Sequence, residues 1–157
     1  MITVTYNRAH TIVRALSSIR NQTYKDIELV VIDGGSSDNT VDLISDLISS
    51  RDIVHSAPDN GIYDALNKGL KIASGEIIGF LHSDDQYFDG NVLSFVTDIF
   101  LDESIDIVYG DVCFFSEMSE DKILRTYKSD LLTYKNLAWG KMPAHPAIFY
   151  RRKVFET

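Results

Sequence analysis

The chain has 157 residues, of which 45% are hydrophobic, and a formal net charge of −8 at pH 7. This length is typical of one domain and is enough to bury a hydrophobic core. The acidic balance argues against non-specific nucleic-acid binding, which needs a cationic surface that displaces counterions from the phosphates. An anionic substrate would therefore need a metal ion or a local cluster of basic side chains.

Strands and helices are predicted to alternate through the first 101 residues. Short apolar or β-branched runs predict strands at residues 2–6, 27–32, 53–54 and 77–81. Apolar residues at helical spacing predict helices at about residues 9–21, 41–48, 62–73 and 92–100. This alternation predicts right-handed βαβ units and a mostly parallel sheet flanked by helices, an α/β fold.

The second part of the chain is less regular. Further strands are predicted at residues 105–109, 112–115, 123–127 and 147–150, whereas residues 131–139 are ambiguous. The lone cysteine, Cys113, lies in an apolar run, which predicts a buried thiol rather than a nucleophile. No apolar run reaches the ~18 residues of a membrane span, and the N-terminal residues lack the pattern of a signal peptide.

Two adjacent carboxylates, Asp84 and Asp85, come directly after the predicted strand at residues 77–81. Ligands of open α/β sheets bind outside the carboxyl ends of the strands. Two carboxylates at that place, together with substrate phosphates, would make a hard oxygen site for Mg²⁺ or Mn²⁺. The dipeptide by itself is more typical of a solvated loop, so this prediction depends on the neighbouring loops.

Polar residues also follow the first two predicted strands. Tyr6 and Asn7 come after the first strand, and Asp33, Gly34 and Gly35 come after the second. The two glycines allow a ligand to approach the backbone closely. Because parallel strands end at the same edge of a sheet, the three loops are expected to meet, which strengthens the prediction of a binding site there.

Several segments, in this order and at this spacing, resemble the family 2 glycosyltransferases: residues 4–7, 18–24, 28–38 and 83–85. Residues 58–69, 143–146 and 149–152 resemble a bacterial branch that builds surface polysaccharide. The resemblance covers essentially the whole chain. It implies the GT-A fold, a Rossmann-like and mostly parallel sheet flanked by helices. Residues 1–101 would form the nucleotide-sugar-binding half, and residues 102–157 part of the acceptor-side half.

The family performs transfer of a sugar, with inversion, from a nucleotide-diphosphate sugar to a glycan or lipid-linked acceptor. The resemblance implies that Thr5, Tyr6 and Asp33 line the nucleotide pocket. It implies that Asp84 reaches the ribose or the diphosphate and that Asp85, the last acid of a D-x-D-like motif, binds Mn²⁺ or Mg²⁺. The metal would take up negative charge on the departing nucleoside diphosphate.

Two positions depart from the pattern of the family. Gly34 stands where many relatives have a second aspartate that contacts the base, so the nucleobase stays open. His82 stands where relatives often have an acid, and packing or support of the site is favoured over metal ligation. Asp64 and Asn67, three residues apart on a predicted helix, share one face and could point into the site. His145 is a candidate contact on the acceptor side.

The general base of the relatives lies on a helix after the region that matches residues 151–155, so it is expected beyond Thr157. Residues 1–157 are therefore expected to bind the donor and to turn over poorly. The basic run at residues 151–153 could meet diphosphate, a lipid phosphate or an anionic membrane, or could be a solvated patch. The pathway of the relatives implies a cytoplasmic location, with peripheral association at the inner face of the plasma membrane.

Two other functions stay open at this stage. A sugar-nucleotide nucleotidyltransferase usually has a glycine- and Lys/Arg-rich loop after the first strand, and residues 6–10 contain no glycine. A non-catalytic donor-binding or scaffold module is the second alternative, against which the intact Asp84–Asp85 pair argues. The sequence leaves open the donor sugar, the acceptor, the linkage and the oligomeric state.

Overall fold

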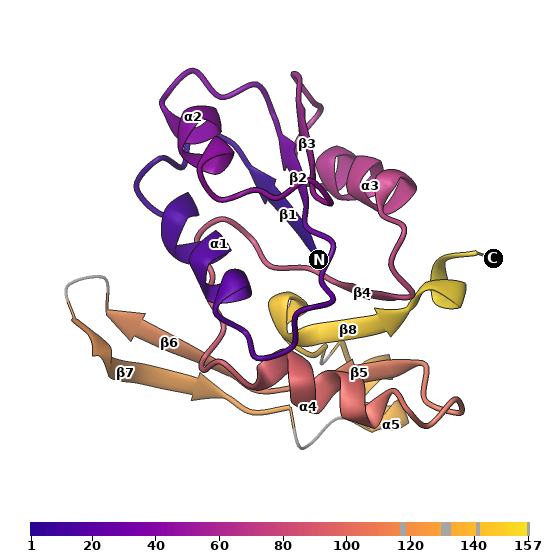
Figure 1. The fold of residues 1–157 in the computed structure, drawn as a ribbon. Coiled ribbons are helices and arrows are strands. Elements are labelled where there is room, and N and C mark those ends of the chain that lie inside the picture. The colour runs from indigo at the N-terminus through magenta and orange to yellow at the C-terminus, as the bar shows by residue number, and fades with distance from the viewer. Residues whose placement is uncertain (117–118, 130–132, 141, 157) are drawn as a thin grey trace.

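The computed structural model describes residues 1–116, 119–129, 133–140 and 142–156, and its elements follow the predicted order (Figure 1). The first half contains β1 (Ile2–Thr5), α1 (Ile12–Arg20), β2 (Val30–Asp33), α2 (Thr40–Ser45), β3 (Ile53–Ser56), α3 (Ile62–Ile72), β4 (Ile77–Gly79) and α4 (Val92–Ile99). The second half contains β5 (Ile107–Tyr109), β6 (Val112–Ser116), β7 (Ser119–Tyr127), α5 (Tyr134–Ala138), η1 (His145–Ala147), β8 (Ile148–Arg151) and η2 (Arg152–Phe155).

One sheet runs through the middle of the molecule. Its strands β1, β2 and β3 are parallel neighbours, which confirms the predicted βαβ units. A parallel bridge between Ile2 and Phe80, and a hydrogen bond from the Leu81 N–H to the Ile2 carbonyl, join the end of β4 to β1. The last strand, β8, lies antiparallel between β4 and β5. The strand order is therefore β3-β2-β1-β4-β8-β5.

Helices cover both faces of this sheet. On one face α3 packs against the apolar side chains of β1, β2 and Phe80. On the other face α1 and α2 pack against Val31 and Leu81. Farther along that face α4 packs against Phe149 of β8. Tyr87 and Met1 pack against both apolar clusters of this face, the one under α1 and α2 and the one under α4. In the described part of the chain, no helix is both long and apolar enough to cross a membrane.

Strand β2 begins later than the predicted run at residues 27–32. The N–H of Leu29 donates to the carboxylate of Asp52, 3.0 Å away, and not to a neighbouring strand. Regular pairing therefore starts at Val30, whose N–H donates to the carbonyl of Met1. The strand also extends one residue farther than predicted, to Asp33.

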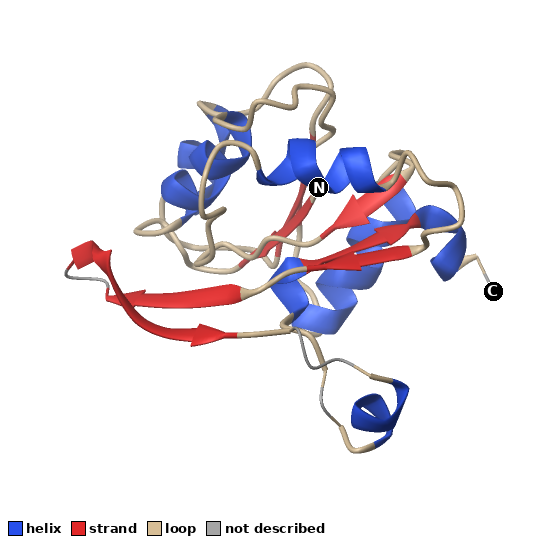
Figure 2. Cartoon of the chain, turned by 90° about the horizontal axis from the view of Figure 1, so that it is seen from below, coloured by secondary structure: helices blue, strands red, loops and turns tan. Residues whose placement is uncertain are grey.

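Strands β6 and β7 form a hairpin that projects from the body of the molecule (Figures 1 and 2). A two-stranded hairpin cannot cover both of its faces, and Cys113 on β6 is only half-buried. The prediction of a buried thiol is therefore wrong. Of the ambiguous stretch at residues 131–139, the structure describes 133–139 and places α5 there, while residues 131 and 132 lie outside the described part.

Candidate functional site

The three polar loops meet at one edge of the sheet. In the register of the parallel strands, Thr5 stands opposite Asp33, and Asp33 stands opposite Ser56. β4 ends at Gly79 and Phe80 stands level with Ile2, so residues 81–83 run on beside β1 toward the level at which β1 ends at Thr5. Asp84 and Asp85 come directly after this level. The predicted convergence of the loops that follow β1, β2 and β4 is confirmed.

Asp33 is fully buried under the loop that follows β2. One carboxylate oxygen accepts hydrogen bonds from the N–H groups of Gly35 and Ser36, at 3.2 and 2.9 Å, and from the hydroxyl of Ser56 at 2.6 Å. The other oxygen accepts from the hydroxyl of Ser36. Charge-assisted bonds of this kind are strong, so Asp33 fixes the path of the glycine loop at the sheet edge.

The two glycines of this loop are required by close packing. A Cβ atom on Gly34 would lie 2.8 Å from Oδ2 of Asp59, and a Cβ on Gly35 would lie 3.2 Å from the nitrogen of Pro58. Gly35 also has a φ angle of 84°, which favours glycine. The loop that follows β3 thus brings the carboxylate of Asp59 against Gly34. Sequence reasoning missed this role of Asp59; the Asp-Asn-Gly turn at residues 59–61 was its only signal.

The loop that follows β1 is tied to the glycine loop by main-chain and side-chain bonds. The N–H of Asn7 donates to the Ser36 hydroxyl at 2.8 Å, and the side-chain oxygen of Asn7 accepts from the N–H of Ser37 at 2.9 Å. Asn7 adopts a φ angle of 51°, a conformation that asparagine tolerates better than most residues. Tyr6 is 59% exposed at this edge, whereas the hydroxyl of Thr5 is buried without a hydrogen-bond partner among the described residues.

Asp84 is exposed and Asp85 is half-buried. Among the described residues no lysine or arginine forms an ion pair with either carboxylate. Burial, together with the neighbouring charge of Asp84, raises the pKa of Asp85 to about 6. A half-buried carboxylate that no lysine or arginine neutralises is stabilised when a cation binds beside it.

Two histidines flank the paired aspartates. His145 stacks on Phe80 with ring centroids 5.0 Å apart and on His82 with centroids 5.6 Å apart. The Nδ1 atom of His82 is buried without a partner in the described part of the chain. Burial lowers the pKa of His82, and partial desolvation together with the neighbouring His82 lowers the pKa of His145. The stacking joins His145 to Phe80 and His82, while a contact of His145 with an acceptor and the support of the site by His82 stay predictions.

The residues at this edge fit a divalent cation that is shared with a substrate. The described residues contain no cluster of three or more His, Cys, Asp or Glu side chains arranged to hold a metal. Mg²⁺ and Mn²⁺ are nevertheless held at many phosphate-transfer sites by one or two carboxylates plus substrate phosphates. Asp84 and Asp85 supply such oxygens, and no described lysine or arginine forms an ion pair with Asp85, so the donor set agrees with this kind of site.

Asp64 lies in the first turn of α3, which follows the loop at residues 57–61, and Asn67 lies in the middle of that helix. Asp64 accepts a hydrogen bond from the N–H of Asn60 and forms an ion pair with Lys68 at 3.0 Å. Asn67 is exposed on the same helix. Asp64 therefore supports the turn that carries Asp59, while a contact of either residue with substrate stays a prediction.

The basic run at residues 151–153 lies away from the sheet edge that carries Asp84 and Asp85. Arg151 pairs with Ile77, the residue at the end of β4 that is remote from Asp84 and Asp85. The Arg152 guanidinium donates to the carbonyls of Gly75 and Ala73, at 2.9 and 2.6 Å, and Lys153 forms an ion pair with Asp106. Of the alternatives for this run, the placement argues against a contact with a diphosphate at the paired aspartates.

Comparison with known sequences finds the family model described as glycosyl transferase family 2 matching residues 1–157. A PGL/p-HBAD biosynthesis glycosyltransferase of Mycobacterium tuberculosis is 36% identical to the chain, over 100% of the chain and 60% of that protein. The UDP-Glc:alpha-D-GlcNAc-diphosphoundecaprenol beta-1,3-glucosyltransferase WfgD of Escherichia coli is 38% identical, over 71% of the chain and 44% of that protein. The chain thus spans no more than about 60% of these relatives.

Comparison with solved structures supports the GT-A fold. Residues 1–349 of TarS from S. aureus, in complex with UDP-GlcNAc, match 99% of the chain and 45% of that protein with a TM-score of 0.80 and 21% identity. The mannosyltransferase PcManGT from Pyrobaculum calidifontis, in complex with GDP-Man and Mn²⁺, matches 99% of the chain and 44% of that protein with a TM-score of 0.69 and 23% identity.

Proposed function

Because the chain belongs to glycosyl transferase family 2, we propose that it binds a nucleotide-diphosphate sugar at the sheet edge where β1, β2 and β4 end. In this proposal the chain is part of an inverting transferase that moves the sugar to a glycan or lipid-linked acceptor of the cell surface. The observation that carries the proposal is the convergence of the loops after Thr5, Asp33 and Leu81 at one edge. The relatives named for PGL/p-HBAD biosynthesis and for glucosyl transfer to alpha-D-GlcNAc-diphosphoundecaprenol support the class of acceptor.

Each loop has a separate task in binding the donor. The glycine loop, whose path Asp33 fixes and which packs closely on Pro58 and Asp59, forms one wall of the edge against which the nucleoside can lie. Tyr6 offers an exposed aromatic ring for the base, and Thr5 offers a hydroxyl that has no hydrogen-bond partner among the described residues. Asp84 and Asp85 lie where the diphosphate of the donor would bind. Asp59, beside Gly34, is positioned to contact the nucleobase or ribose in place of a side chain at residue 34.

The reaction that we propose is a displacement at C1 of the sugar. The acceptor oxygen forms a bond to C1 while the bond from C1 to the diphosphate oxygen breaks, and the nucleoside diphosphate leaves with the bonding electron pair. A general base takes the proton of the acceptor hydroxyl, and we assign no described residue to this role. A divalent cation held by Asp84 and Asp85 would neutralise charge on the leaving diphosphate.

Thermal unfolding with nucleotides tests the proposal. We expect UDP, GDP, dTDP or CDP to raise the melting temperature in the presence of Mn²⁺ and to have little effect with EDTA. A ligand that binds only the folded state at about 100 times its Kd stabilises by about 2.7 kcal/mol. Asp85→Asn should abolish the metal-dependent part of the shift. Asp98→Asn, which changes an exposed carboxylate on α4, is the matched control and should keep it.

The other outcomes separate the alternatives. Stabilisation by nucleoside triphosphates alone would favour a nucleotidyltransferase, and the absence of a response to every nucleotide would favour a scaffold module. A metal-dependent shift that survives Asp85→Asn would remove Asp85 from the metal site. Cytoplasmic location and peripheral association with a membrane remain predictions, which fractionation of cells that express the whole protein would test.

A further inference from the structure

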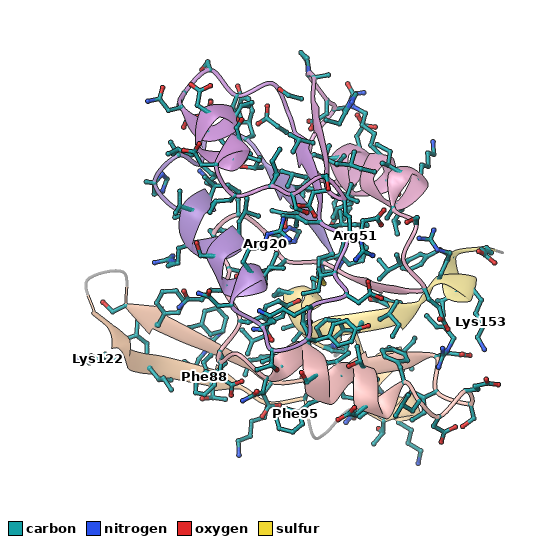
Figure 3. The ribbon with its side chains drawn as sticks, in the orientation of Figure 1. Arg20, Arg51, Phe88, Phe95, Lys122 and Lys153 are labelled. Carbon is teal, nitrogen blue, oxygen red and sulfur yellow. The ribbon has the colours of Figure 1, made fainter. Side chains whose placement is uncertain are left out.

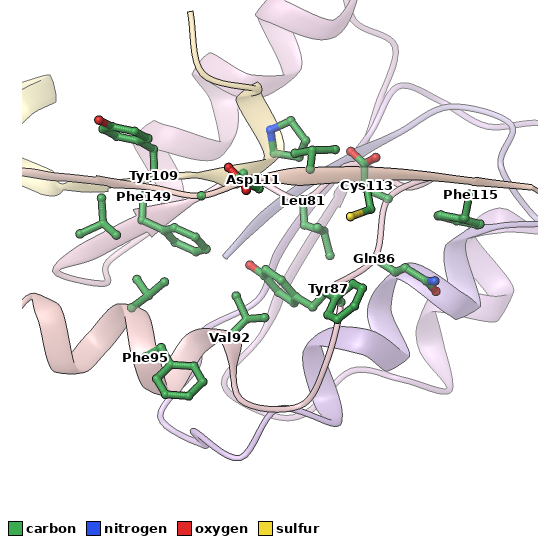
Figure 4. A pocket seen from close by; sticks show the side chains of 18 of the residues that line it. Leu81, Gln86, Tyr87, Val92, Phe95, Tyr109, Asp111, Cys113, Phe115 and Phe149 are labelled. Carbon is green, nitrogen blue, oxygen red and sulfur yellow. The ribbon is translucent and has the colours of Figure 1, made fainter. Parts of the chain in front are cut away.

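A cavity of about 630 Å³ opens beside Asp85, on the face of the sheet that α4 covers. Its walls come from α4, from β5 and β6, and from the segment that follows Asp85 (Figure 4). Figure 4 shows Leu81, Tyr87 and Phe149 in the space between these strands and the helix. A volume of this size falls within the range of roughly 300 to 1,000 Å³ that is usual for small-molecule sites.

The cavity is mainly apolar and has large aromatic side chains on its outer side. Phe88 and Phe95 both line it and are 76% and 65% exposed, and they lie on the outside of the molecule beside α4 (Figure 3). Exposed aromatic side chains that gather around a hollow are typical of a binding site. The charged side chains among the described residues that line it are the carboxylates of Asp85 and Asp111.

The charges around the cavity favour an uncharged ligand. The carboxylate of Asp111 in the wall would repel a phosphate or a carboxylate group that entered the apolar space, and the carboxylate of Asp85 would add to this repulsion when no metal is bound. One cation lies nearby, because the Arg14 guanidinium sits 5.0 Å from the ring centroid of Phe115, a residue of the wall. Arg14 is not itself among the described residues that line the cavity.

We propose that this cavity is the acceptor subsite, and that it takes an uncharged acceptor whose hydroxyl-bearing head carries an alkyl or aryl group. The inference rests on the proposed function, because it needs the donor sugar at Asp85. Asp85 belongs both to the donor edge and to the cavity wall. An acceptor with its apolar group in the cavity would therefore present its hydroxyl at the sugar, and the apolar group would supply much of the affinity.

Cys113 gives a direct readout of occupancy, because it lines the cavity and is the single cysteine of the sequence. The experiment measures the rate of its alkylation by iodoacetamide in the 157-residue chain. We expect octyl β-D-glucoside, below its micelle concentration, to slow the reaction at concentrations about tenfold or more below those at which methyl β-D-glucoside acts. Octyl phosphate, with the same chain and a charged head, should protect more weakly than octyl β-D-glucoside.

Two pairs of variants localise the effect. Phe115→Ala removes a ring from the wall, whereas Phe114→Ala changes its neighbour on β6, which is not among the residues that line the cavity. Phe95→Ala removes an exposed ring of the wall, so its effect on folding should be small. We expect Phe115→Ala and Phe95→Ala to weaken protection by octyl β-D-glucoside several-fold, and Phe114→Ala to leave it unchanged.

Each other result overturns a stated part of the inference. Equal protection by octyl and methyl β-D-glucoside would exclude an apolar subsite, and stronger protection by octyl phosphate would exclude an uncharged occupant. A Cys113 that resists iodoacetamide without ligand would show that protein fills the cavity. Stabilisation by UDP without protection would overturn the inference and leave the proposed function standing. Protection without stabilisation by any nucleotide would overturn the acceptor role together with the proposed function.

Discussion

Asp85 carries a carboxyl group whose pKa is raised from 3.8 to about 6 by burial and by the charge of Asp84. Because the folded chain binds this proton more tightly than the unfolded chain, the free energy of unfolding falls as the pH rises from about 4 to about 6, and levels off above that range. Asp85→Asn removes the cost of the buried charge. We expect the metal-free variant to be more stable than the parent at about pH 7, by on the order of 1 kcal/mol.

Urea unfolding at two pH values measures this difference. At about pH 4 the parent carboxyl is largely protonated and the two proteins should unfold at nearly the same urea concentration. The groups that face Asp85 are Asp84 and His145, and both are unchanged in the variant. Asp98→Asn, at an exposed position, is the control. A gain in stability of Asp85→Asn that is the same at both pH values would contradict the assignment.

Gly34 and Asp59 form a pair that can be tested at the level of single atoms. Gly34→Ala would place a methyl group 2.8 Å from Oδ2 of Asp59, whose other oxygen accepts a hydrogen bond from the N–H of Gly61 at 2.8 Å. Moving the carboxylate away would weaken this bond, so we expect a loss of about 1 kcal/mol. The loss should become much smaller in an Asp59→Ala background, because the clash is then absent.

A double-mutant cycle on urea midpoints gives the coupling energy between the two positions. Gly110→Ala serves as the control, since a Cβ on Gly110 would meet no atom within 4 Å. A cost of Gly34→Ala that is the same with and without Asp59 would show that the two residues do not contact in solution. It would also remove the argument that Asp59 stands in for a side chain at residue 34.

At the scale of the elements, the hydrophobic pattern was sufficient wherever an element is amphipathic and packs on the sheet. The apolar residues of α1 and α3 recur at helical spacing, and the structure buries those faces. Asp84 and Asp85 could be placed at the sheet edge because a buried strand ends directly before them. The start of β2 could not be placed, because the pairing of Leu29 is set by a distant side chain, Asp52.

Contacts between loops far apart in the sequence were also beyond prediction from local pattern. Asp59 reaches Gly34 from another turn, and His145 reaches His82 across more than sixty residues (residues 82 to 145). The single apolar run around Cys113 could not show that β6 belongs to a projecting hairpin with an open face. Periodicity reports which face of an element is apolar, and the partner of that face is decided by the rest of the fold.

Gly69 on α3 provides a test at this scale. A Cβ on Gly69 would lie 2.6 Å from Cγ2 of Ile2 and 3.4 Å from Cγ1 of Ile32, where the helix packs on β1 and β2. Alanine favours the helix over glycine by about 1 kcal/mol, but overpacking of a core costs about 1 to 3 kcal/mol. We expect Gly69→Ala to lower the free energy of unfolding by roughly 1 kcal/mol, measured by urea denaturation.

The control for this change is Lys71→Ala, at an exposed position of the same helix. Surface substitutions of this kind usually stay within about ±0.5 kcal/mol. If Gly69→Ala proved more stable than the parent, helix propensity would outweigh packing, and the close approach of α3 to β1 would be wrong.

At the scale of the whole molecule, β8 unites the two halves of the chain. It comes from residues 148–151, yet it lies between β4 of the first half and β5 of the second. Successive side chains of β8 serve both faces of the sheet, since Phe149 packs with α4 and Tyr150 packs with the cluster under α3. The two halves therefore share one sheet, and the ability of residues 1–101 to bind the donor alone stays a prediction.

Arg151, the last residue of β8, joins segments of both halves through its guanidinium. Its nitrogens donate to the carbonyl of Ile105 at 3.1 Å, to that of Phe100 at 2.9 Å and to Glu76 at 2.9 Å, and its side chain is 11% exposed. Arg151→Lys keeps the charge but cannot reproduce this fork of donors, so partly buried carbonyls lose their partners. We expect a loss of about 2 kcal/mol in the free energy of unfolding.

Lys153→Ala is the matched control, because it breaks a more exposed ion pair, with Asp106, and should cost less than about 1 kcal/mol. Since β8 lies inside the shared sheet, the loss in Arg151→Lys should appear as one cooperative urea transition, moved as a whole to lower concentration. Following near-UV circular dichroism, to which the half-buried Tyr150 of β8 contributes, together with far-UV circular dichroism checks this. Separate transitions for the two signals would mean that the halves unfold independently, and that β8 does not couple them.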